Sequence, residues 1–182
     1  MTDRKTAVAG VKVRTLAFWG MRSLVFQLVL IGAAVALPAV AHLTGAPVRV
    51  LLPMHWPVIL AGLVYGWRGG ALTGLLAPAA SYLVSGMPYP PMLPAMTVEL
   101  FAYGFAAGLL VENLRINSFL AVATALVVGR LVFAITVLAG FGVNGNFAAY
   151  FQAALIPGLF AAAGQVIVLP FIARWWINKE QN

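Results

Sequence analysis

Six apolar runs, separated by short breaks, follow a basic N-terminal stretch. The runs cover about residues 24–43, 54–67, 71–86, 92–111, 116–139 and 147–173. A helix needs about 20 residues to cross a bilayer, and the breaks contain the glycine, proline and polar residues that end helices. The break at 87–91 reads MPYPP, which cannot continue a helix. The pattern predicts an all-α membrane protein with six transmembrane helices in one bundle.

The second and third runs are shorter than a full crossing, and we expect a tight turn between them at Arg68-Gly69-Gly70. Glycines recur at every fourth position through these two runs, at Gly62, Gly66, Gly70 and Gly74. Small residues at this spacing let helix backbones approach closely. We therefore expect close helix packing here, with a hinge as the alternative role.

Composition narrows the class of protein. Of the 182 residues, 63% are hydrophobic and 8% are charged, whereas a soluble domain has about 45–50% apolar and about 25% charged residues. A soluble globular domain is therefore excluded. The chain has no cysteine, which also excludes a disulfide scaffold and a thiolate metal site.

The N-terminal 23 residues carry five of the eleven basic residues. A cleaved signal peptide is one interpretation, but the run at 24–43 is too long for a signal core and no small-residue cleavage site follows it. We predict a basic cytoplasmic segment at 1–23, a transmembrane substrate-binding domain at 24–173 and a cytoplasmic tail at 174–182.

The remaining charges predict the orientation of the bundle. With the N-terminus inside, six spans place nine basic residues on the cytoplasmic side and only Arg49 outside. This asymmetry is what the positive-inside rule requires. We expect a multi-pass protein of the cell (inner or plasma) membrane with both termini in the cytoplasm.

Two charged residues, Glu99 and Arg130, lie within predicted spans. At a rise of about 1.5 Å per residue, Glu99 lies about 10 Å and Arg130 about 13–15 Å below the outer ends of their helices. An unpaired charge in hydrocarbon costs several kcal/mol, so we expect the two side chains to pair. The pair either locks two helices together or lines a substrate cavity that opens to the outside.

Further residues near the outer side have the chemistry of a small-molecule site, which is apolar and aromatic with a few placed polar groups. Trp56 and Tyr89 taken singly are equally typical of membrane-interface anchors. A metal site is not expected, because the two histidines have no neighbouring carboxylates. Our candidates for lining the site beside Glu99 and Arg130 are His55, Trp56, Tyr89, Tyr103, Asn144 and Gln152.

Catalytic constellations are missing from the sequence. Nucleophilic catalysis needs a serine, cysteine or threonine with a base within reach. The chain has no cysteine, and no serine lies in a recognisable motif with a histidine. No G-x-x-x-x-G-K-[ST] phosphate loop is present either. We predict no enzymatic activity, no cofactor and no nucleic-acid partner.

Several short motifs resemble one family of membrane proteins. They are LPMHWPVILAG at 52–62, LAP at 76–78, SGMP at 85–88, MLPAM at 92–96 with Glu99, Gly129-Arg130, and Ile156-Pro157-Gly158 with Gln165. In order and spacing they are similar to the substrate-binding S components of energy-coupling factor (ECF) transporters. The resemblance covers most of the chain beyond residue 24.

The resemblance implies six helices that bind a vitamin, a vitamin precursor or a similar micronutrient near the outer face. It also implies a transmembrane coupling subunit and two ATPase subunits as partners, besides the lipid bilayer. The family commonly shows Ala-x-x-x-Ala on the first helix, where the coupling subunit docks. This chain has Gly32, Ala33 and Ala36 there, so we expect the partner interface at these small residues.

Two other functions remain open from the sequence. One is a self-sufficient, proton-coupled secondary transporter with Glu99 as the proton carrier. The other is a non-transporting scaffold subunit of a larger membrane complex, which would bind no small molecule.

Overall fold

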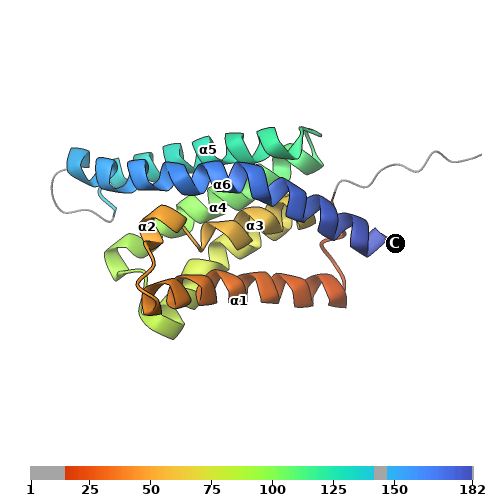
Figure 1. Cartoon of the computed structure of the whole chain (residues 1–182), viewed down its shortest axis with the longest axis horizontal. Coiled ribbons are helices and arrows are strands. Elements are labelled where there is room, and N and C mark those ends of the chain that lie inside the picture. Colours follow the sequence, from red (N-terminus) through yellow and green to blue (C-terminus); the bar gives the residue numbers. More distant parts are fainter. Residues whose placement is uncertain (1–14, 142–146, 182) are drawn as a thin grey trace, which may run out of the picture.

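The computed structural model describes residues 15–141 and 147–181, and the elements assigned there are all helical (Figure 1). They are α1 (Met21–Leu43), α2 (Val48–Leu51), α3 (His55–Ser85), the 3₁₀ turn η1 (Pro90–Met92), α4 (Leu93–Glu112), α5 (Ser118–Leu138) and α6 (Phe147–Gln181). The all-helical class predicted from the apolar runs is confirmed for this part of the chain.

The helices form one bundle with α3 and α4 at its centre. In Figure 1, α1 runs along one side and α5 and α6 along the other. The α3–α4 contact is the most extensive, α1 packs on α3, and α6 packs on α3 and α5. One hydrophobic core formed mainly by α3, α4 and α5 follows from this arrangement.

The chain turns sharply within α3, at Gly66. This glycine has φ 70° and ψ −170°, whereas the residues around it are helical. A positive φ favours glycine because it has no Cβ. The side chain of Glu112 faces the turn, and its Oε2 accepts a hydrogen bond from the Trp67 N–H at 3.1 Å. The turn predicted at Arg68–Gly70 is therefore wrong by a few residues, because those positions stay helical.

Contacts with α4 show that the chain reverses direction at this turn. A Cβ placed on Gly62 would meet the carbonyl oxygen of Gly104, and one on Gly70 would meet the same group. Gly66 itself faces the end of α4 at Glu112, and Gly74 faces Leu100. The path thus runs along α4 toward its C-terminal end and then back. The close packing predicted for the regularly spaced glycines is confirmed, and Gly66 also makes the turn.

Five stretches of the described residues are long and apolar enough to cross a membrane. They are Met21–Leu43, Val48–Ser85, Pro90–Glu112, Ser118–Leu138 and Ile156–Gln181. The predicted second and third spans, 54–67 and 71–86, fall almost wholly within Val48–Ser85, and the reversal at Gly66 lies near the end of the second. The count of six crossings and their orientation stay predictions.

The ends of α1 and α6 meet at one end of the bundle. Arg22, at the start of α1, forms an ion pair with Glu180 near the end of α6, with Nε and Oε2 2.9 Å apart. Trp176 packs edge-on against Phe26 and Tyr65. Residues 174–181, predicted as a tail, continue helix α6. The first and last helices therefore hold each other at this end.

Candidate functional site

A buried carboxylate marks the centre of the candidate site. Glu99 of α4 is only 3% exposed, and its Oε1 lies 3.1 Å from Nη1 of Arg130 on α5. The pairing expected from their similar depths is therefore present. Gly129 lets α5 approach α4 here, because a Cβ at this position would collide with the Tyr103 ring. Contact between opposite charges offsets part of the free-energy cost of burying each of them.

Tyr103 adds a hydrogen bond to the same carboxylate oxygen. It follows Glu99 by four residues on α4, a spacing that puts both side chains on one helix face. Its hydroxyl donates to Glu99 Oε1 at 2.9 Å, and the side chain is fully buried. Glu99 Oε1 is thus held by a guanidinium and a phenol from two helices.

His55, the first residue of α3, completes the group. Its Nε2 lies 3.9 Å from Glu99 Oε1, and its ring centroid lies 5.1 Å from that of Tyr103. The residue is 3% exposed, and neither ring nitrogen has a hydrogen-bond partner among the described residues. We call His55, Glu99, Tyr103 and Arg130 the Glu99 cluster. It contains a guanidinium, a carboxylate, a phenol and an imidazole, and the two imidazole nitrogens have no hydrogen-bond partner among the described residues.

Arg130 is the accessible member of the Glu99 cluster. Its side chain is 21% exposed, against 4% for its Glu99 partner. A Cβ on Gly158 of α6 would lie 2.7 Å from Nη2 of Arg130 and 3.3 Å from a methyl carbon of Leu52. Gly158 therefore makes the room that the guanidinium occupies. The sequence did not single out this role, although a Pro-Gly pair inside an apolar run was the signal for it.

The other predicted lining residues are not all brought to the cluster. Trp56 packs toward α6: its indole N–H donates to the Leu51 carbonyl at 2.9 Å, and its ring lies next to Gly164. Tyr89, the residue before η1, is 64% exposed, whereas Glu99 is buried. Asn144 and the side chain of Gln152 lie outside the described residues.

Part of helix α1 is not covered by the other helices, and small residues lie on this part. Gly32 and Ala36 are exposed and Ala33 is partly so. A Cβ on Gly32 would meet no atom within 4 Å.

The described side chains contain no group of three histidine, cysteine or acidic residues that would hold a metal ion.

The fold and the Glu99 cluster define an all-helical membrane protein with a charged, hydrogen-bonded group buried between its helices. Over residues 22–175 the chain matches the family described as the ECF transporter, substrate-specific component. Because the match covers most of the chain, the protein belongs to this family. Neither the curated proteins nor the solved structures gave a match.

Membership of this family indicates the general function of the protein. ECF S components are plasma-membrane proteins that bind small substrates and work with a membrane coupling subunit and ATPases. They are transport and binding subunits and not enzymes. The protein is accordingly a substrate-binding membrane subunit of an ECF transporter.

Proposed function

We propose that this chain captures a small vitamin or vitamin-precursor-like micronutrient from outside the cell at the Glu99 cluster. It then delivers this substrate inward together with a coupling subunit and two ATPases. The observation that carries the proposal is the ion pair between buried Glu99 and partly exposed Arg130, held between α4 and α5. Intramembrane ionisable residues are costly and typically mark substrate or ion pathways.

Each member of the Glu99 cluster has a distinct role in this proposal. Arg130 offers the planar donor fork that suits a carboxylate or phosphate of the substrate. Glu99 holds the guanidinium in place, and the Tyr103 hydroxyl in turn donates to Glu99. His55 offers one ring nitrogen to a polar group of the substrate, since both of its nitrogens are unused among the described residues. A substrate with an anionic group and a further hydrogen-bonding group fits this arrangement.

The same proposal includes six crossings with both termini in the cytoplasm. The reversal at Gly66 divides α3 into parts of about 16 Å and 28 Å at the helical rise per residue. The second part spans a hydrocarbon core of about 30 Å, and the first part together with α2 supplies another crossing. An even number of crossings agrees with the Arg22–Glu180 ion pair, which joins the start of α1 to the end of α6.

The coupling subunit would dock on α1. Gly32 and Ala36 are one helical turn apart, and both are exposed. Small residues at this spacing let another transmembrane helix approach closely. Ala33 lies at the edge of the same face.

Thermal unfolding of the purified protein against a panel of vitamins and their precursors tests the proposal. A ligand at a hundredfold excess over its dissociation constant stabilises the folded state by about 2.7 kcal/mol. We expect one clear stabiliser, and we expect Arg130→Gln to abolish its effect. Lys179→Gln, which changes an exposed cation near the end of α6, is the matched control and should respond as the unaltered protein does.

Two results would contradict the proposal. Equal stabilisation of the unaltered protein and Arg130→Gln would place the substrate elsewhere. Uptake in cells without any coupling subunit, abolished by an uncoupler, would instead support a proton-coupled secondary transporter.

A further inference from the structure

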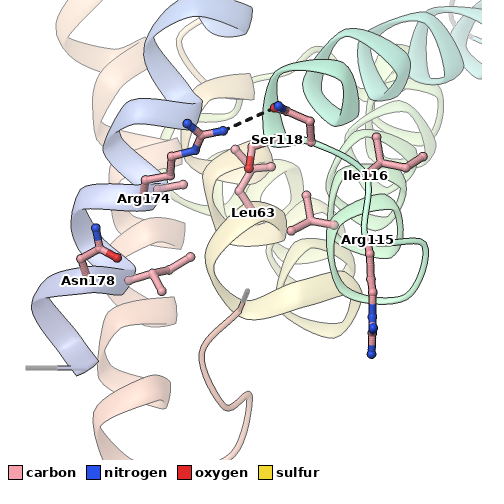
Figure 2. A pocket seen from close by; sticks show the side chains of 10 residues that line it. Leu63, Arg115, Ile116, Ser118, Arg174 and Asn178 are labelled. Atoms are coloured by element: carbon pink, nitrogen blue, oxygen red, sulfur yellow. Dashed lines mark hydrogen bonds between the residues drawn. The ribbon is translucent and has the colours of Figure 1, made fainter. Parts of the chain in front are cut away.

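A hollow lies where the α4–α5 connection meets the end of α6 (Figure 2). It has a volume of about 420 Å³. Part of its wall belongs to the buried core, including Leu63, Val111 and Ile177. The polar part of the wall consists of Arg115, Asn117, Ser118, Arg174 and Asn178. None of these residues belongs to the Glu99 cluster.

The hollow lies at an end of the bundle. Residues 113–117 connect two membrane-spanning stretches, Pro90–Glu112 and Ser118–Leu138. The connection therefore lies at the boundary between hydrocarbon and water, the region that lipid headgroups occupy. The hollow brings apolar core atoms and cationic side chains together at this boundary.

Arg174 is the main cation that faces the start of α5. Its Nη2 donates to Asn117 Oδ1 at 3.4 Å, and its guanidinium lies 5.1 Å from the centre of the Phe119 ring. Figure 2 shows the side chain extending from α6 toward the start of α5, with Asn178 one turn further along α6.

No carboxylate of the described residues lies within ion-pair distance of Arg174. The three glutamates in that part of the chain each face another arginine: Glu99 faces Arg130, Glu112 faces Arg68, and Glu180 faces Arg22. A guanidinium has five N–H donors, and Arg174 gives one of its nitrogens to a long hydrogen bond. Donors thus remain for an anion.

The start of α5 adds to the positive potential of the hollow. Asn117 precedes the helix, and its side chain accepts from the Phe119 N–H at 3.0 Å. The N-terminal end of a helix carries a partial positive charge. Together with Arg174 it favours an anion between α5 and α6.

We propose that this hollow binds the phosphate group of an anionic phospholipid. Arg174 and Asn178 contact the phosphate, and the core residues of the wall contact the first carbons of the lipid. A lipid is favoured over a free ion because the wall combines cations with apolar core atoms at the membrane boundary. Basic pockets between transmembrane helices are known to suit anionic headgroups. This site is independent of the Glu99 cluster and of the substrate.

Native mass spectrometry of the detergent-purified full chain tests the site. We expect phosphatidylglycerol to bind about fivefold more tightly than phosphatidylcholine, as one basic contact near a membrane surface provides. Arg174→Gln should remove this preference. Asn178→Asp, which keeps Arg174 but adds a negative charge to the wall, should remove it too. Arg49→Gln, at an exposed arginine of α2 outside the hollow, is the control and should leave the preference unchanged.

A parallel titration with inorganic phosphate distinguishes the two sources of the phosphate group. If phosphatidylglycerol binds and millimolar inorganic phosphate does not compete, the ligand is a lipid. If inorganic phosphate binds with the same dependence on Arg174 and Asn178, the hollow is a site for the free ion. Equal binding of the two lipids without phosphate binding, or a preference that survives in both variants, would overturn the proposal.

Discussion

Glu99 receives contacts from two helices besides its own. The Arg130 guanidinium and the Tyr103 hydroxyl share its Oε1, and His55 approaches the same oxygen. A carboxylate with such neighbours can hold the bundle together, position Arg130 for a substrate, or do both. A structural role and a substrate-positioning role involve the same contacts, so stability and substrate binding must be measured separately to tell them apart.

Replacing Glu99 with glutamine makes that distinction. Glu99→Gln keeps the shape of the side chain but leaves Arg130 without its counter-charge. We expect the free energy of unfolding to fall by about 1–3 kcal/mol, less than for a fully buried pair because Arg130 is partly exposed. We also expect at least a tenfold loss of substrate affinity, because the guanidinium is no longer held in position. Thermal unfolding with and without the substrate measures both effects.

Glu112→Gln is the matched control for this variant. Glu112 lies on the same helix and approaches another arginine, with its Oε1 3.9 Å from Nη1 of Arg68, but it is remote from the Glu99 cluster. It should lower stability and leave affinity unchanged. If Glu99→Gln behaved in the same way, the buried pair would be purely structural.

At the level of helices, the packing of α3 on α4 depends on glycine. Gly70 and Gly104 lie so close that a Cβ on either would overlap the backbone of the other. Neither helix can move away freely, because α4 also packs on α5 and α3 also packs on α1. The contact is therefore intolerant of even one added methyl group.

Gly70→Ala should destabilise the protein by about 1–3 kcal/mol, the typical cost of overpacking a core. Gly32→Ala on α1 is the control, because a Cβ there meets no atom within 4 Å. It should leave the unfolding temperature unchanged or slightly raised, since alanine favours a helix more than glycine does. Thermal unfolding of both variants checks the expectation. Equal unfolding temperatures would show that the α3–α4 contact is looser than described.

At the scale of the whole molecule, the orientation in the membrane depends on which helix ends lie at the same end of the bundle. The α4–α5 connection and the end of α6 meet around the hollow lined by Arg174. The start of α1 joins the same end through Arg22 and Glu180. Under the proposed topology this end faces the cytoplasm, and Tyr89 lies at the outer end.

Single cysteines test this orientation directly, because the chain contains none. Tyr89 and Leu114 are both well exposed and lie in connections at the two ends of α4. In intact cells a membrane-impermeant maleimide should label Tyr89→Cys and should label Leu114→Cys only after permeabilisation. The opposite pattern would reverse the topology, and labelling of both from outside would contradict an N-in, C-in bundle.

Local pattern and composition were enough to predict the membrane class, the positions of most helices and the close glycine packing. These features depend on the apolar runs and on residue spacing within one helix, which can be read along the chain. The pairing of Glu99 with Arg130 was predictable for a related reason. Two charges within apolar spans at similar depths are strongly favoured to meet.

Packing between helices decided the remaining features. The reversal falls at Gly66 and not at Arg68–Gly70, because several glycines permit a turn and the Glu112 side chain packs against Gly66 and accepts from the N–H of the next residue, Trp67. His55 lies beside Glu99 because the first part of α3 packs along α4 before the reversal. The space for Arg130 comes from Gly158 of α6. Each of these contacts joins residues far apart in the sequence, so it depends on how the helices pack and not on any local pattern.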